Sequence, residues 1–178
     1  MHPCLREAAV LVPLRRDASG AWRLVIVRRS EFGVHSGQLA FPGGARDARD
    51  ASLQATALRE AYEEIGLPLA AARVLAQLPS VETRVSSFVI TPYLAVIERP
   101  SEWRPDAREI AEVLEPELAK FLAPQTRAHA HDLLPPGWKA VRLPYYPVGP
   151  YRLWGASERI LHPLLARIVA GEWEEFNT

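Results

Sequence analysis

The chain has 178 residues, of which 48% are hydrophobic and 24% are charged, and both values are typical of one globular domain. Lysine plus arginine and aspartate plus glutamate each total 21, so the formal net charge is zero, which argues against a dedicated nucleic-acid or anionic-membrane binder. We therefore expect a single domain over residues 1–178 that binds neither nucleic acid nor membrane, and small-molecule chemistry stays open.

The first residues show no pattern of export or membrane insertion. The apolar stretch at residues 8–14 is interrupted by Pro13 and lacks the basic start of a signal peptide. It is also too short to span a bilayer. Cys4 is the single cysteine, which excludes an intrachain disulfide and is typical of a reducing compartment. We expect a cytoplasmic protein.

The first predicted elements are strands. Apolar runs at residues 8–14 and 22–27 flank a turn-forming stretch at residues 15–20, and this arrangement predicts a β-hairpin. A short apolar segment at residues 38–41 then runs into a Pro-Gly-Gly sequence at residues 42–44. This pattern predicts a short strand followed by a tight loop.

Residues 52–65 have the period of an amphipathic helix. Leu58, Ala61 and Ile65 recur at i, i+3 and i+7, so they mark the buried face of that helix. Gly66 is placed to end it. The two candidates for the N-cap are Asp50 and Ser52.

The second half of the chain is predicted to hold three strands, at residues 73–78, 88–97 and 110–114. A short helix at residues 117–122 and a final helix at residues 156–170 follow. The proline-rich stretch 124–150 is predicted to be a loop with one strand near residues 140–143. Strands and helices interleaved in this order predict one α/β domain with a mixed sheet.

The predicted helix 52–65 carries an unusual acidic cluster. Glu60, Glu63 and Glu64 lie at i, i+3 and i+4, so they share a face roughly opposite the apolar stripe and repel one another. They also occupy the last turns, where the helix dipole disfavours anions. A hard divalent cation would compensate them, because Mg²⁺ prefers oxygen ligands. The pattern favours a metal site over the alternative of a solvated acidic face.

Upstream of this helix, Gly43 and Gly44 lack Cβ atoms, which would let the backbone approach a phosphate closely. The segment from Gly44 to Leu67 resembles the Nudix box, whose pattern is Gly, five residues, Glu, seven residues, then Arg-Glu-apolar-any-Glu-Glu-any-Gly-apolar. The second half of the box matches at Arg59, Glu60, Ala61, Glu63, Glu64, Gly66 and Leu67. In the first half, Ala51 stands where the box has its first Glu, while Asp50 keeps the spacing from Gly44.

The Nudix resemblance implies an α/β/α sandwich with a mixed sheet, and metal-dependent hydrolysis of a nucleoside diphosphate linked to another group. It implies Mg²⁺ or Mn²⁺ held by Glu60, Glu63 and Glu64, with Glu64 as the first choice of ligand. It also implies that Arg59 positions a carboxylate of the box. The general base stays open between a box glutamate and a later carboxylate.

Residues 28–44 look like the signature that precedes the box in coenzyme A pyrophosphatases, and residues 153–161 are similar to the start of the last helix in that family. Arg29, Phe32 and Gly33 replace the usual Ser, Leu and Arg. The resemblance implies cleavage of coenzyme A or acyl-CoA to 3′,5′-ADP and 4′-phosphopantetheine or its acyl form. The implied substrate-binding residues are Arg28, Arg29, His35, Gly43 and Gly44.

Alternative functions stay open at this point: a diphosphatase of ADP-ribose, NADH or nucleoside triphosphates, or a Nudix-fold ligand sensor without turnover. A homodimer is also left open. Trp154 is expected in the hydrophobic core rather than on a platform for base stacking. Asp106, Glu109 and Glu112 could supply a further carboxylate, but a solvated face is the favoured reading for them.

Overall fold

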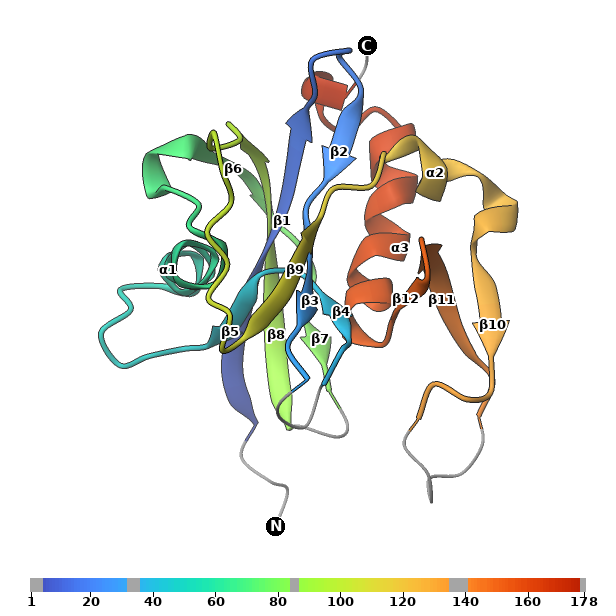
Figure 1. The fold of residues 1–178 in the computed structure, drawn as a ribbon, viewed down its shortest axis with the longest axis horizontal. Coiled ribbons are helices and arrows are strands. Elements are labelled where there is room, and N and C mark those ends of the chain that lie inside the picture. The colour runs from blue at the N-terminus through green and yellow to red at the C-terminus, as the bar shows by residue number, and fades with distance from the viewer. Residues whose placement is uncertain (1–4, 32–35, 84–86, 135–140, 177–178) are drawn as a thin grey trace.

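The computed structural model describes residues 5–31, 36–83, 87–134 and 141–176 (Figure 1). Its strands are β1 (Arg6–Arg16), β2 (Trp22–Leu24), β3 (Ile26–Arg29), β4 (Leu39–Ala40), β5 (Gly43–Ala45), β6 (Ala72–Gln77), β7 (Val81–Glu82), β8 (Phe88–Ile97), β9 (Ile110–Leu114), β10 (Ala128–Ala130), β11 (Leu143–Val148) and β12 (Tyr151–Trp154). Its helices are α1 (Leu53–Ile65), α2 (Ala119–Leu122) and α3 (Ala156–Val169), with 3₁₀ turns at Leu69–Ala71, Pro124–Thr126 and Glu174–Phe176.

The main sheet is mixed, as the sequence predicts. Its strand order is β2-β1-β8-β6, with β5 also pairing β1 and β7 also pairing β8. The central pair β1–β8 is parallel and the other pairs are antiparallel. The middle of β1 is buried on both faces, which explains why its sequence is a nearly continuous apolar run. Two three-stranded sheets, β4-β3-β9 and β10-β11-β12, complete the fold.

Two hydrophobic cores lie on opposite faces of the main sheet. On one face, Ala61 and Ile65 of α1 pack with Leu11 of β1, and on the other, Leu161 of α3 packs with Val12. Figure 1 shows the sheet between α1 and α3. The α/β/α sandwich is therefore confirmed. Within the described residues, no helix is long and apolar enough to cross a membrane.

The first predicted hairpin forms, but its second strand divides. β2 ends at Leu24 while still paired with β1. β3 begins at Ile26 and pairs with β4 and β9 instead. The N–H of Val25 still donates to the carbonyl of Pro13 at 2.9 Å. Pro13 has no N–H with which to return that bond, so the ladder ends there.

Two further predictions are corrected by the fold. The Pro-Gly-Gly sequence does not form a loop throughout, because Gly43 and Gly44 belong to β5, which pairs with β1. The stretch 124–150 holds β10 and β11, and β11 runs over Leu143–Val148, so it meets the strand predicted near residues 140–143 only at Leu143. Residue 140 of that prediction lies outside the described residues. Tyr146 and Val148 are buried in the core on the α3 side. Their burial outweighs the low strand propensity of the prolines around them.

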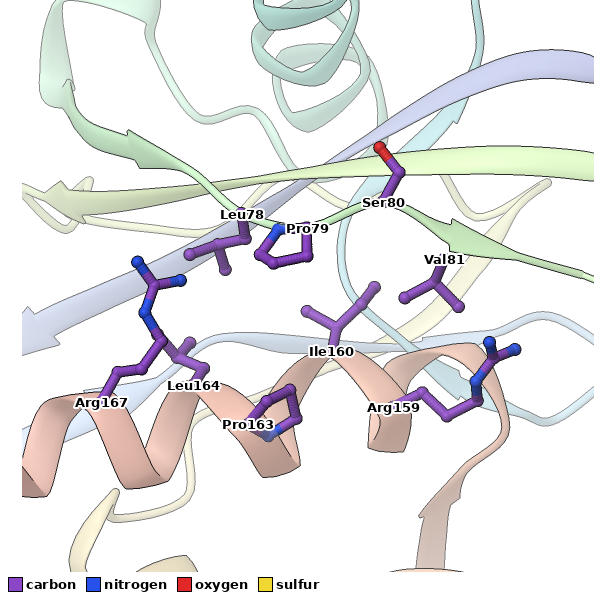
Figure 2. A pocket seen from close by; sticks show the side chains of 9 residues that line it. All are labelled: Leu78, Pro79, Ser80, Val81, Arg159, Ile160, Pro163, Leu164 and Arg167. Carbon is purple, nitrogen blue, oxygen red and sulfur yellow. The ribbon is translucent and has the colours of Figure 1, made fainter.

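A cavity of about 200 Å³ lies between α3 and the segment from Leu78 to Val81 (Figure 2). Its lining is mostly apolar, with Arg159 and Arg167 toward its two ends. Arg159 donates to the carbonyl of Glu82 at 2.7 Å, and Arg167 pairs with Glu172. Both cations are therefore already engaged by the protein. The acidic cluster Glu60, Glu63 and Glu64 lies on α1 and does not line this cavity.

Candidate active site

Helix α1 begins and ends as its sequence predicts. Between the two N-cap candidates, Ser52 is the cap, and its hydroxyl accepts from the N–H of Ala55 at 3.1 Å. Gly66 ends the helix in the left-handed conformation, with φ 71°, which favours glycine. The buried stripe includes Ala61 and Ile65. These boundaries place all three glutamates in the second half of the helix.

An acidic cavity of about 270 Å³ lies against this part of α1, and its lining residues are Glu60, Glu63, Glu64, Asp106, Arg108 and Glu109. Asp106 and Glu109 reach it because their loop caps the helix. The N–H of Asp106 donates to the carbonyl of Glu64 at 3.0 Å, which satisfies one of the free carbonyls of the last turn. The sequence favoured a solvated face for Asp106 and Glu109. Glu109 is indeed exposed and Asp106 is partly buried, yet both also line the cavity beside the glutamates, which is the further-carboxylate alternative.

Glu64 is the most enclosed of these carboxylates, with 2% of the residue exposed. One oxygen accepts from the N–H of Gly43 at 2.9 Å, and the other lies 3.5 Å from Nη1 of Arg29. Burial raises the pKa of Glu64 to about 7, although both contacts act in the opposite direction. The expected placement opposite the apolar stripe is therefore wrong for Glu64, which faces β5 and β3.

The Gly43-Gly44 pair gives these carboxylates room. A Cβ on Gly44 would lie 2.6 Å from the carboxyl carbon of Glu60, and one on Gly43 would lie 2.3 Å from the carbonyl oxygen of Ala9. Gly43 must therefore be glycine, because its Cβ would collide with the backbone of β1, whereas a Cβ on Gly44 would displace the carboxylate of Glu60. Burial also raises the pKa of Glu60. These contacts explain both glycines, and their contact with a phosphate stays a prediction.

Arg59 forms ion pairs with three acidic side chains and so fixes their positions. Its Nη1 lies 2.9 Å from a carboxylate oxygen of Glu60 and 2.9 Å from one of Glu63. Its Nε and Nη2 donate to the two oxygens of Asp50 at 2.8 and 2.9 Å. This hydrogen bonding holds the pKa of Asp50 well below its usual range. Glu60 and Glu63 thus have a cationic partner in Arg59.

Asp50 is the upstream acid that the sequence left open. It is buried and also accepts from the hydroxyl of Thr56 at 2.9 Å. Asp50 anchors Arg59 through both of its oxygens, whereas Ala51, which aligns with the first Glu of the box, has no carboxylate to offer. One extra residue before the helix is accommodated without loss of that anchor.

The adjacent residues Arg28 and Arg29 point to different neighbours. Arg29 approaches Glu64, whereas Nε of Arg28 lies 3.4 Å from Glu112 and its guanidinium stacks 5.2 Å above the ring of Tyr151. A bulge in the β3–β9 pairing places Ile110 opposite Arg29, which keeps Ile110 on the α1 side. The structure therefore brings Arg29, but neither Arg28 nor Glu112, to the glutamates. His35 lies outside the described residues.

The donor set suits a hard divalent cation. Glu60, Glu63, Glu64, Asp106 and Glu109 offer only carboxylate oxygens, the ligands that Mg²⁺ and Mn²⁺ favour. Burial raises the pKa of both Glu60 and Glu64, and a cation bound between them would favour their ionised forms. Across the described residues, however, no group of three or more His, Cys, Asp or Glu side chains is already arranged to hold an ion.

Comparisons with known proteins agree with this geometry. The profile of the NUDIX domain matches residues 5–135. The chain is 40% identical over 165 residues to a Salmonella paratyphi B protein named "Uncharacterized Nudix hydrolase NudL", covering 92% of this chain and 83% of that protein.

Among solved structures, a MutT/nudix family protein from Enterococcus faecalis matches with a TM-score of 0.66 and 18% identity, over 96% of this chain and 64% of that one. The Nudix hydrolase RenU from M. smegmatis matches with a TM-score of 0.55 and 25% identity, over 65% of this chain and 72% of that one. The chain therefore belongs to the Nudix hydrolases, enzymes that generally use divalent metal ions and act on small-molecule nucleoside diphosphate derivatives.

Proposed function

We propose that this Nudix hydrolase cleaves the diphosphate bond of coenzyme A or acyl-CoA. The products would be 3′,5′-ADP and 4′-phosphopantetheine or its acyl form. The observation that carries hydrolysis is the cavity in which Glu60, Glu63 and Glu64 meet Asp106 and Glu109. The choice of coenzyme A is supported by the resemblance of residues 28–44 to coenzyme A pyrophosphatases. We further propose that residues 1–178 act as one domain, because α3 packs on the same sheet as α1.

Glu60, Glu63 and Glu64 are the proposed ligands for Mg²⁺ or Mn²⁺. A bound ion would neutralise the diphosphate oxygens and lower the pKa of water. Arg59 acts as a positioning residue in this proposal, because it touches Glu60 and Glu63 while Asp50 holds it from the other side.

Arg29 is the better placed of the two arginines for contact with the diphosphate. It is partly exposed and lies beside Glu64, and a guanidinium can bind phosphate oxygens through two hydrogen bonds. Arg28 is instead held by Glu31 and Glu112, at 2.9 and 3.4 Å. We therefore assign Arg29 to the diphosphate and leave Arg28 and His35 as proposed contacts to the rest of the substrate.

We propose Glu109 as the general base. Its carboxylate makes no hydrogen bond or ion pair with the residues described by the structure, so it is available to water. Asp106, the other acid on the same loop, is held by Arg108, and this lowers its pKa to about 2. Asp106 would therefore accept a proton poorly at neutral pH.

Product analysis tests the proposed function. Purified protein is incubated with coenzyme A and Mg²⁺ in ¹⁸O-labelled water, and the products are separated and weighed by mass spectrometry. We expect 3′,5′-ADP and 4′-phosphopantetheine, one of them carrying a single ¹⁸O atom. Cleavage of ADP-ribose, NADH or a nucleoside triphosphate without cleavage of coenzyme A would overturn the substrate. Tight binding with no turnover of any of them would favour the ligand sensor.

A further inference from the structure

The loop between β8 and β9 carries two of the carboxylates that line the acidic cavity. It spans residues 98–109, and Asp106 and Glu109 lie near its end. Glu109 is exposed, and its carboxylate makes no hydrogen bond or ion pair within the part of the chain that the structure describes. The side chain of the proposed general base is therefore not held by contacts of its own, and its position depends on how the backbone of the loop is held.

Two contacts hold the earlier part of the loop. The ring N–H of Trp103 donates to the carboxylate of Glu115 at 2.7 Å. The N–H of Asp106 donates to the carbonyl of Glu64 at the end of α1. Both contacts come before Glu109 in the chain, so they fix the start and the middle of the loop and not the peptide groups of Glu109.

Ser30, directly after β3, holds the last part of the loop. Its N–H donates to the carbonyl of Glu109 at 2.7 Å, and its hydroxyl donates to the carbonyl of Arg108 at 2.8 Å. These two carbonyls belong to the peptide bonds on either side of Glu109. Figure 1 shows β3 beside β9, and the two hydrogen bonds continue that strand pairing past its bulge to the proposed base.

The hydroxyl of Ser30 cannot act on a substrate directly. Ser30 is 6% exposed, and it is not among the described residues that line the acidic cavity. Any residue except proline could supply the N–H at this position, but few side chains could supply the hydroxyl. Burying a hydroxyl is costly unless it is hydrogen-bonded, and the carbonyl of Arg108 satisfies it. The side chain of Ser30 therefore reaches Glu109 only through the backbone.

Ser30 also connects the loop to the substrate side of the site. The preceding residue, Arg29, lies 3.5 Å from Glu64. The carbonyl of Ser30 accepts from the N–H of Gly37 at 3.3 Å, so Ser30 also joins the two ends of residues 30–37. One buried residue thus links the strand of Arg29 to the peptide groups around Glu109.

We propose that Ser30 is a positioning residue for the general base, which it fixes through the two peptide bonds that flank Glu109. The inference rests on the proposed function, since it takes Glu109 as the group that accepts the proton of the attacking water. A general base must lie within hydrogen-bond reach of that proton, and a displacement of about 1 Å can cost roughly 100-fold in rate. The alternative is that the buried hydrogen bond of Ser30 only stabilises the fold.

A double-mutant cycle separates these two roles. The variants are Ser30→Ala, which removes the hydroxyl and keeps the backbone hydrogen bond, Glu109→Gln, and the two combined. Ser157→Ala is the matched control, because Ser157 is 8% exposed and lies on α3, on the other side of the main sheet from α1. We measure kcat and KM with Mg²⁺ and coenzyme A, or with whichever diphosphate the wild type cleaves. Amide hydrogen exchange over residues 104–110 and urea denaturation are recorded for every variant.

Ser30→Ala should lower kcat by about tenfold and change KM by less than about twofold. Amide exchange should become faster over residues 104–110, and Ser157→Ala should change neither kcat nor that exchange. In the Glu109→Gln protein, Ser30→Ala should lower kcat no further, because the base through which it acts is already lost. A folded Ser30→Ala protein with normal kcat would overturn the inference, and so would effects of the two substitutions that multiply.

The inference and the proposed function fail in different ways. Cleavage of ADP-ribose instead of coenzyme A would refute the proposed substrate and leave the cycle valid on that substrate. Multiplying effects with coenzyme A as the substrate would refute the role of Ser30 and leave the proposed function intact. A kcat that Glu109→Gln leaves unchanged would overturn both the assignment of the base and the role of Ser30.

Discussion

Replacing Glu64 with glutamine should make the metal-free protein more stable at alkaline pH. The substitution keeps the shape of a side chain that is 2% exposed, and its amide oxygen can still accept from the N–H of Gly43. Folding raises the pKa of Glu64 from 4.5 to about 7. Between these pH values the folded state binds a proton that the unfolded state does not, so the free energy of unfolding falls as pH rises. Above pH 7 the loss amounts to roughly 3 kcal/mol.

Urea denaturation of wild type and Glu64→Gln in EDTA tests this reasoning. At pH 5 the buried Glu64 of the wild type is protonated, and the two proteins should have nearly equal free energies of unfolding. At pH 8 the variant should be more stable by roughly 2 to 3 kcal/mol. Added Mg²⁺ should stabilise the wild type more than the variant, because an ion that binds only the folded state shifts the equilibrium. A difference that does not change with pH would refute the burial argument.

Other substitutions test the rest of the site. Gly44→Ala should reduce turnover by at least about tenfold, a loss of roughly 1.4 kcal/mol, because its Cβ would displace the Glu60 carboxylate; unchanged kinetics would contradict this. Arg59→Met should destabilise the fold by about 3 kcal/mol by leaving Asp50 buried and unpaired, and adding Asp50→Asn should recover part of that loss in denaturant titrations. Chelation should abolish hydrolysis and Mg²⁺ or Mn²⁺ should restore it, so full activity after exhaustive dialysis against EDTA would exclude a metal mechanism. Glu109→Gln should lower kcat with little change in KM, whereas an unchanged kcat would exclude Glu109 as the base.

Local sequence patterns predicted the elements that depend on local physics. The bounds of helix α1 could be predicted from its apolar period, its serine cap and Gly66. The position of its three glutamates near the end of the helix follows from those bounds. The bounds of β8 (Phe88–Ile97) and β9 (Ile110–Leu114) match the predicted ranges. Strong periodicity and clear stop signals sufficed in these segments.

Features that depend on tertiary contacts could not be predicted in this way. Asp106 and Glu109 line the cavity because their loop hydrogen-bonds to the end of α1. The periodicity of a sequence does not indicate which loop will supply the hydrogen bonds at the end of a helix. Strand β11 contains prolines that weaken the local signal, yet core packing of Tyr146 holds it in a sheet. Trp154 illustrates the opposite error, because this large aromatic residue was expected in the core, yet it is only partly buried and lies outside both cores of the described residues. The sequence did contain one usable signal for a tertiary contact. Asp50 keeps the spacing from Gly44 that the box gives its acid, and Asp50 is the residue that holds Arg59.

The most direct test of the central claim is kcat/KM for coenzyme A, dephospho-coenzyme A, ADP-ribose and NADH, measured with Mg²⁺ under one set of conditions. Coenzyme A should have the highest value, and dephospho-coenzyme A should be clearly poorer because it lacks the 3′-phosphate and its charge-assisted contacts. A preference for ADP-ribose or NADH of about tenfold, or roughly 1.4 kcal/mol of transition-state binding, would contradict the assignment of coenzyme A as the substrate.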